Sequence, residues 1–125
     1  MKQIATDNAP KPSGHYAQAV VHGDVVYVSG QLPVDPATGE KRTASIEEQT
    51  EQALRNLREV LVAAGSDIDH VVKTTVYVSD IELWDRVNAV YASFFGMHRP
   101  ARAVVPTSKL HFGFQIEIEA VAVLC

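Results

Sequence analysis

The segment that decides the fold is Gln115-Ile116-Glu117-Ile118-Glu119-Ala120-Val121-Ala122-Val123-Leu124. Apolar residues alternate with other residues in its first half, and successive side chains of a β-strand point to opposite faces of a sheet. One face carries Ile116, Ile118, Ala120 and Ala122. The other face carries Gln115, Glu117, Glu119, Val121 and Val123. The segment therefore predicts a strand that buries one face in a core and presents a second, partly apolar face elsewhere.

The preceding segments predict an α+β order, ββαβαββ, within a single domain over residues 1–125. Residues 1–14 read as an irregular arm, and the segment 31–39 reads as a turn-rich loop. Tyr16–Val21 and Val25–Ser29 are expected to form a hairpin across His22-Gly23-Asp24. The other strands are expected at 71–78 and 101–106, before the one at 115–124.

Two helices are expected between these strands. The first begins at a capping box, Ser45 with Glu48, and ends at Gly65. Its apolar stripe consists of Ile46, Ala53, Leu54, Leu57, Val60, Leu61 and Ala64. The second is capped by Asp80 and closed by Gly96. Its stripe consists of Ile81, Trp84, Val87, Tyr91 and Phe94.

Two helices cover only one face of such a sheet. The strand 25–28 is nonetheless apolar on both faces, because Val25 and Tyr27 alternate with Val26 and Val28. A second apolar face needs a cover, and another copy of the chain is the simplest one. The sequence therefore predicts an oligomer.

Composition limits the classes of function. Of the 125 residues, 46% are hydrophobic and 21% are charged, which suits a chain with a core. The net charge of −4 argues against a general nucleic-acid or membrane-surface binder. One cysteine, no apolar start and no long apolar run favour a soluble, cytoplasmic protein without membrane contact.

Arg102 and the strand glutamates Glu117 and Glu119 are the first candidates for chemistry. A guanidinium near a carboxylate is able to hold a small carboxylic acid and to position a water molecule against it. The alternatives are a structural ion pair for Arg102 and a solvated strand face for Glu117 and Glu119.

Three further positions attract attention. Asn88 falls on the second helical stripe, where it either satisfies backbone groups or contacts a ligand. Tyr16 opens a strand and is either a packing or a site residue. Ser29-Gly30 ends a strand, where glycine permits either a simple turn or close approach of a ligand.

Other chemistries have little support. The chain has no Gly-x-Ser-x-Gly elbow and no phosphate-binding glycine-rich loop. Its five histidines form no i, i+4 pair and no Cys-x-x-Cys is present, so no metal site is expected. One locally basic segment, with His98, Arg99, Arg102, Lys109 and His111, suits a small anion better than RNA.

Several motifs together resemble the RidA/YjgF family of reactive intermediate deaminases. The resemblance rests on Pro100-Ala101-Arg102-Ala103-x-Val105, Ser108-x-Leu110 and Ile116-Glu117-Ile118, and extends over nearly the whole chain. Further matches are Asn8-Ala9-Pro10, Gly14-x-Tyr16, Val28-Ser29-Gly30-Gln31, Val72-Lys73-Thr74-Thr75-Val76 and Val87-Asn88. Each piece is weak alone, whereas the combination is specific.

The resemblance implies a chorismate-mutase-like fold and a homotrimer with three sites at its subunit interfaces. It implies hydrolysis of 2-imino acids to 2-keto acids and ammonia, with no metal and no cofactor. Arg102 would bind the substrate carboxylate and Glu117 would hold or activate the attacking water. Tyr16, Ser29, Gly30 and Asn88 would line or support the pocket.

The chain departs from the family pattern at three places. Val104 stands where many deaminases of the family have a cysteine, although its backbone could still contact a ligand. Residues 96–99 form a shorter segment than in the archetypal members, and 110–114 replace their Leu-Pro turn. The last two changes lie near the expected site and bear on the choice of substrate.

Two other functions compete with imine hydrolysis. One is a non-catalytic module that binds small carboxylates, and the other is an RNA-acting member of the family. The presence of both Arg102 and Glu117 favours the deaminase over the module. The acidic balance of the chain disfavours RNA.

Overall fold

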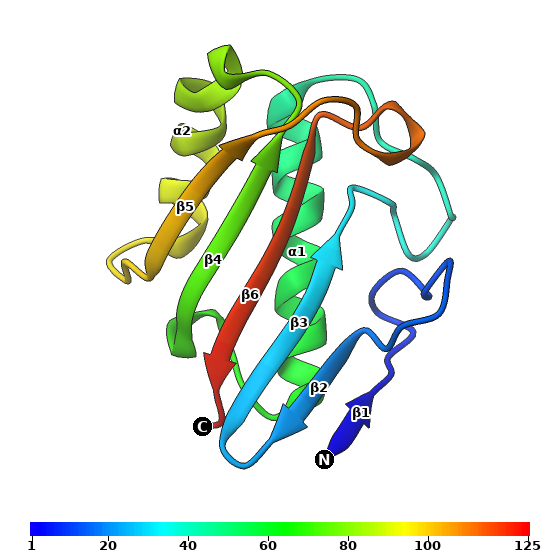
Figure 1. Ribbon diagram of the computed structural model, residues 1–125, viewed down its shortest axis with the longest axis vertical. Helices are drawn as coiled ribbons and strands as arrows, with labels where there is room; N and C mark the ends of the chain where they lie inside the picture. Colours follow the sequence, from blue (N-terminus) through cyan, green and yellow to red (C-terminus); the bar gives the residue numbers. More distant parts are fainter.

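The computed structural model describes residues 1–125 as a six-stranded sheet with two α-helices (Figure 1). The strands are β1 (Lys2–Ile4), β2 (Ala19–His22), β3 (Val25–Gln31), β4 (Val71–Val78), β5 (Ala101–Pro106) and β6 (Ile116–Val123). The helices are α1 (Ile46–Ala64) and α2 (Trp84–Phe95). Short 3-10 turns occupy Ile68–His70, Ile81–Leu83 and His111–Gly113. The expected α+β class is confirmed.

The strand order in the sheet is β1-β2-β3-β6-β4-β5. The last strand of the chain, β6, therefore lies in the middle, between β3 and β4. Only β4 and β5 run parallel, and the helix α2 supplies the crossover that a parallel pair requires. Both helices lie behind the sheet in Figure 1, so one face carries the helical layer and the other carries none.

Helix α1 forms where its sequence predicts it. The Ser45 side chain accepts a hydrogen bond from the Glu48 backbone N–H at 3.1 Å, the first of the two capping-box bonds. The predicted apolar stripe is buried from Ile46 to Leu61, with Ala64 packed at its margin. Gly65 adopts φ 90°, a conformation that favours glycine, and ends the helix.

Helix α2 corrects two expectations. Asp80 caps the 3-10 turn 81–83 instead of the helix itself, by accepting from the Glu82 backbone N–H at 2.9 Å. Of the expected stripe, Ile81 and Trp84 are 49% and 38% exposed. Ile81 belongs to the 3-10 turn and Trp84 is the first residue of α2, so the core-facing stripe does not extend back to them. The core-facing residues are Val87, Tyr91 and Phe95, and Phe94 is only partly buried.

The N-terminal part of the chain also differs from expectation. Residues 1–14 are not wholly irregular, because Lys2–Ile4 pair with β2 as an edge strand. A strand of three residues is too short to show an alternation of apolar and polar residues in the sequence. Its one buried side chain, Ile4, is 5% exposed in the structure. The strand expected from Tyr16 begins only at Ala19, because the Tyr16 backbone N–H donates a hydrogen bond to the nearby Gly14 carbonyl and not to a neighbouring strand.

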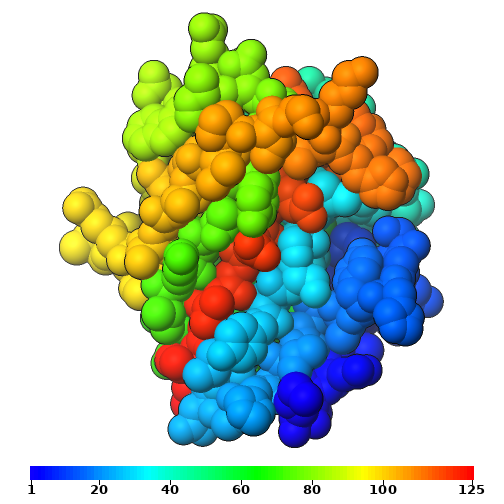
Figure 2. All heavy atoms as spheres, in the orientation of Figure 1, coloured from blue at the N-terminus to red at the C-terminus, as the bar shows by residue number.

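The two faces of the sheet differ in character. Ile116 and Ile118 of β6 and Val76 of β4 are fully buried beneath the helices. The opposite face shows Tyr27, which is 51% exposed, and the partly exposed Val121 and Val123. Figure 2 views this open face, where atoms of β3, β6, β4 and β5 lie side by side without helical cover. No helix of the chain is long and apolar enough to cross a bilayer.

A buried glutamine fixes the N-terminal arm to the sheet. The side chain of Gln18, 3% exposed, accepts from the Thr6 backbone N–H at 2.7 Å. Its amide donates to the carbonyls of Thr6 at 3.0 Å and Pro10 at 2.9 Å, with a longer contact of 3.4 Å to Ala9. One side chain thus replaces the strand partners that residues 6–10 lack.

We expect Gln18→Ala to release the arm. The variant leaves backbone groups of residues 6–10 without partners, and each unsatisfied buried group costs about 1–3 kcal/mol. Hydrogen exchange should therefore accelerate at Thr6, with a loss of global stability measured by urea unfolding. Gln3→Ala, at an exposed position in β1, is the matched control. Unchanged exchange at Thr6 would contradict this role.

An ion pair joins the two helices at the surface. Arg86 of α2 donates to both carboxylate oxygens of Glu47 in α1, at 2.7 and 2.6 Å. The bond from Arg86 holds the pKa of Glu47 below its ordinary value. A lowered carboxyl pKa stabilises the folded state above the unfolded-state pKa, and this contribution is lost as pH falls through the folded-state pKa.

We expect Glu47→Gln to lower the melting temperature slightly at pH 7. The difference from the wild type should shrink as acid protonates Glu47, and also in high salt, because the pair is exposed to solvent. Thermal unfolding against pH measures both effects. Glu82→Gln, at an exposed position outside any ion pair, is the control. A difference that grows in acid would show that the sign is wrong.

Candidate functional site

Glu117 lies on the open face of the sheet, near the start of the central strand β6. It pairs with Tyr77 across the β4–β6 ladder, while its neighbours Ile116 and Ile118 point into the core. The carboxylate is half-buried and makes no hydrogen bond or ion pair within the chain. Burial raises the pKa of Glu117, the nearby Glu119 raises it further, and His111 opposes the rise. A carboxylate of this kind is suited to accept a proton.

Glu119 shares the face but not the role. Its carboxylate accepts a hydrogen bond of 2.7 Å from the Tyr77 hydroxyl, and this bond is the main cause of the raised pKa of Tyr77. Glu119 is therefore engaged within the sheet, whereas Glu117 is free. The alternation along the strand could not distinguish these two glutamates, and only the family resemblance singled out Glu117.

Gly30 leaves the space that Glu117 occupies. A Cβ atom at position 30 would lie 2.9 Å from the Glu117 Cδ atom and closer still to Oε2. The β3–β6 register shifts between Val28 and Gln31, and this irregularity brings the Gly30 backbone beside the carboxylate. Glycine is required at position 30 because the Glu117 carboxylate of the same chain occupies the space that a side chain would fill.

A hollow of about 300 Å³ opens over Gly30 and Glu117. Its lining consists of Ser13, Tyr16, Ser29, Gly30, Leu32, His111 and Glu117. A neighbouring hollow of about 340 Å³, formed by the N-terminal arm and the loop after β3, shares Ser13, Tyr16, Gly30 and Leu32 with it. Four predicted site residues, Tyr16, Ser29, Gly30 and Glu117, therefore come together.

The hydroxyl groups in this hollow are partly engaged. Ser29 Oγ donates to the Ala17 carbonyl at 2.6 Å and so braces the strand end. The Tyr16 oxygen accepts from the Ser13 backbone N–H at 3.3 Å, while its ring is 48% exposed. Tyr16 therefore remains able to donate its own proton to a bound molecule.

Arg102 lies on the other side of the sheet. It pairs with the buried Thr74 of β4, so its side chain leaves β5 on the helix-covered face, at the edge beside α2. Its guanidinium donates to Asn88 Oδ1 at 2.9 Å and lies 4.7 Å from the Tyr91 ring centroid and 5.4 Å from that of Trp84. The group makes no ion pair within the chain, and several of its donors remain available to an anion.

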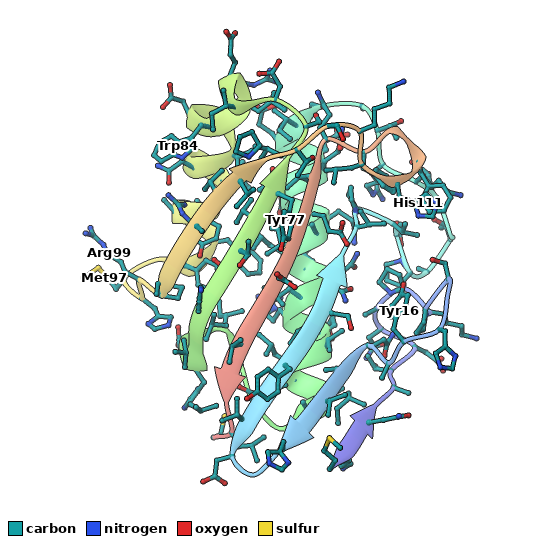
Figure 3. The ribbon with its side chains drawn as sticks, viewed as in Figure 1. Tyr16, Tyr77, Trp84, Met97, Arg99 and His111 are labelled. Atoms are coloured by element: carbon teal, nitrogen blue, oxygen red, sulfur yellow. The ribbon has the colours of Figure 1, made fainter.

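Asn88 and Val104 complete this second cluster. The Asn88 amide orients Arg102, which explains a polar residue on the α2 stripe. Val104 packs its side chain against the core at the edge strand β5. The predicted residues thus form two groups on opposite faces: Tyr16, Ser29, Gly30 and Glu117 on one, and Asn88, Arg102 and Val104 on the other. In Figure 3, Tyr16 and His111 lie at one edge of the sheet and Trp84 at the other, with Tyr77 between them.

Sequence reasoning missed several neighbours of these groups. Trp84 and Tyr91 read as core residues but also flank the Arg102 guanidinium. The sequence indicated His111 only as part of a locally basic segment. The turn between β5 and β6 places it at the same hollow as Glu117. A histidine six positions before a strand glutamate gives no signal in the sequence. No cluster of three or more histidine, cysteine, aspartate or glutamate side chains is placed to hold a metal ion.

Comparisons with known proteins cover nearly the whole chain. A family model described as endoribonuclease L-PSP matches residues 6–124. A protein of Rattus norvegicus named 2-iminobutanoate/2-iminopropanoate deaminase is 45% identical over 122 residues, 98% of this chain and 89% of its own length. A RutC family protein of Pyrococcus horikoshii is also 45% identical, over 98% of both chains.

Solved structures show the same fold. The YjgF gene product of E. coli superposes with a TM-score of 0.94 at 44% identity, over 98% of both chains. E. coli TdcF, solved with bound serine, superposes with a TM-score of 0.95 at 38% identity, over 100% of both chains. The six-stranded arrangement with two helices is therefore shared with these proteins.

We expect Gly30→Ala to displace the Glu117 side chain towards solvent. The added Cβ atom takes the space of the carboxyl group, and the loss of burial should lower the Glu117 pKa towards its ordinary value. Carboxyl carbon NMR against pH measures this change. Gly14→Ala is the control, since its Cβ atom would make only ordinary contacts of 3.6 and 3.8 Å with Tyr16. An unchanged Glu117 titration in Gly30→Ala would contradict the close approach.

Proposed function

This chain belongs to the RidA/YjgF family, and we propose that it hydrolyses 2-imino acids and their enamine tautomers to 2-keto acids and ammonia. The observation that carries this proposal is the free, half-buried carboxylate of Glu117 beside Gly30. The deaminase names of the rat and human relatives, at 45% and 43% identity, support the same reaction. A cytoplasmic site of action fits the composition, and the proposed reaction consumes only water.

Glu117 is the proposed base. Burial and the nearby Glu119 raise the pKa of Glu117, against the opposing effect of His111, and this makes it a better proton acceptor than an ordinary surface carboxylate. A water molecule held against it attacks the electrophilic carbon of a protonated imine. Tyr16 and the backbone around Gly30 bound the hollow in which that carbon would lie.

Arg102 is the proposed carboxylate anchor. A guanidinium fork pairs with a planar carboxylate through two parallel hydrogen bonds, and Asn88 already fixes its orientation. The backbone of Val104, two residues further along the same edge strand, is available for a further contact. The serine bound to E. coli TdcF also carries a carboxylate, which supports recognition of small amino-acid-like molecules in this family.

One chain does not bring Arg102 and Glu117 together, because they leave opposite faces of the sheet. A complete site requires a second copy whose Arg102 edge meets the open face of the first. The open face offers apolar contacts at Tyr27 and Val121 for such a partner. We therefore include a homotrimer with sites shared between neighbouring copies in the proposal.

Action on RNA is the second candidate. It is favoured by the description of the matching family model as endoribonuclease L-PSP. It is disfavoured by the net charge of −4 and by a hollow of about 300 Å³, a size that suits a small molecule. Incubation with single-stranded RNA, under conditions where imine hydrolysis is measured in parallel, distinguishes the two. Binding of a keto acid without any turnover would instead indicate a carboxylate-binding module.

We expect Glu117→Gln and Arg102→Lys to fail in different ways. An assay that couples a dehydratase and its amino acid to keto-acid release measures both, after subtraction of spontaneous hydrolysis. Removal of the base should lower kcat by roughly 10²–10⁴-fold. Loss of the planar fork should raise KM by roughly 10- to 100-fold, since a hydrogen bond to a charged group contributes about 1.5–3 kcal/mol. Cys125→Ser is the control and should keep its activity, because Cys125 is exposed and outside both clusters.

Mixing these two impaired variants, at a substrate concentration below the wild-type KM, tests the shared site. If each site takes Arg102 from one copy and Glu117 from another, co-refolded mixtures contain some sites with both native residues. Activity should then reappear in the mixture, and light scattering should report a trimer. A stable monomer, or a mixture as inactive as its components, would contradict a site shared between copies.

A further inference from the structure

His111 is a titratable residue at the candidate site that the proposed reaction does not yet use. It begins the 3-10 turn His111–Gly113 between β5 and β6 and lines the same hollow as Glu117 and Tyr16. Its side chain is exposed, and neither ring nitrogen makes a hydrogen bond within the chain. The imidazole is therefore accessible to a molecule bound in the hollow.

The position of the His111 ring is fixed by its neighbour. The rings of His111 and Phe112 stack with centroids 3.6 Å apart and planes 16° from parallel. Phe112 in turn meets the buried Phe114 edge-on at 6.0 Å and lies under the Lys41 ammonium at 4.7 Å. Contacts within the segment 111–114 and from the loop that contains Lys41 thus hold the imidazole at the rim of the hollow.

This turn contains the only non-glycine residue with a positive φ. Phe112 adopts φ 60° and ψ 17°, a region that is unfavourable for a bulky side chain. Such a conformation persists only where surrounding contacts impose it, and it is found preferentially at functional sites. The left-handed conformation at 112 allows the His111 and Phe112 rings to stack despite their adjacency in sequence.

Two titratable groups share the hollow with the imidazole: Glu117 from β6 and Tyr16 from the N-terminal segment. Lys41, from the loop before α1, lies over the adjacent Phe112 ring. The positive charge of His111 opposes the burial that raises the Glu117 pKa, so the two groups interact across the hollow. The other side chains with a hydroxyl proton that line the hollow are those of Tyr16, Ser13 and Ser29.

Imine hydrolysis needs more than one proton transfer. The protonated imine nitrogen starts with two hydrogens and leaves as ammonium with four, so both protons of the attacking water end on nitrogen. Glu117 accepts the first proton as the C–O bond forms. The nitrogen of the tetrahedral adduct must also be protonated, because a neutral amine is a poor leaving group until it is protonated. A second side chain at the hollow is able to supply this proton while Glu117 still holds the first one.

We propose that His111 is this second group: it protonates the departing nitrogen and then recovers a proton from the adduct hydroxyl as the carbonyl forms. The C–N bond breaks as the oxygen lone pair forms the C=O bond. Glu117 then returns its proton to the released ammonia, so both residues regain their starting states and no oxidant or reductant is required. This role rests on the proposed deaminase function and assigns the acid and the base to two separate side chains.

The test is the pH dependence of keto-acid release by the full-length wild type and His111→Gln, from an imine generated in situ by a dehydratase. We expect the wild-type rate to fall as pH rises, because an imidazole donates a proton only in its protonated form. His111→Gln should lose this dependence and show a kcat lower by roughly 10²-fold with KM little changed. His22→Gln, at an exposed position at the β2–β3 turn, is the matched control and should behave as the wild type.

Two further measurements separate a chemical role from a structural one. Imidazole in the buffer should restore part of the activity of His111→Ala but none of that of Glu117→Gln. Carboxyl carbon NMR should show a higher Glu117 pKa in His111→Gln, because the opposing positive charge is gone. An active wild type whose pH profile and Glu117 titration are unchanged by His111→Gln would overturn this inference alone. A wild type without deaminase activity would overturn the proposed function as well.

Discussion

The alternation of side chains along β6 is the constraint on which the site depends. Ile116 and Ile118 are fully buried between the sheet and the helices, and this burial fixes the strand against rotation or a one-residue slip. Glu117 must then point to the opposite face. The hydrophobic effect that assembles the core therefore also places a carboxylate on the open face, where no helix covers it.

Buried amides fix the segments that surround this carboxylate. Gln49 of α1, 1% exposed, accepts from the Gln115 backbone N–H at 2.9 Å and so anchors the start of β6. Asn56 donates to the Leu32 and Val34 carbonyls at 3.0 and 2.9 Å and anchors the loop after β3. Gln18 does the same for the N-terminal arm. Each side chain satisfies backbone groups that no strand or helix satisfies, and together they hold the walls of the hollow.

The distribution of charges over two faces has a consequence for assembly. Arg102 is held by Asn88 on one face, and Glu117 is kept clear of partners on the other. An arginine and a glutamate that met within one chain would form an ion pair, and the pair would compete with a ligand. Their separation keeps both groups available until another copy of the chain brings them together, as we propose. Placement of His111 at the rim of the same hollow adds a proton donor to the half that contains the base.

The sequence by itself determined the α+β class, the limits of α1, β4 and β5, and the identity of the family. These features depend on local periodicity, capping residues and motifs, which are written along the chain. The edge strand β1, the 3-10 turn before α2 and the exposure of Trp84 were not predictable in this way, since they depend on contacts between distant segments. Seven site residues could be named from the sequence. Only the tertiary structure decided that the side chains of Arg102 and Glu117 leave opposite faces of the sheet, and that His111 lines the same hollow as Glu117. The physical reason is that the direction of a strand side chain is set by register, and register is set by partners far away in the sequence.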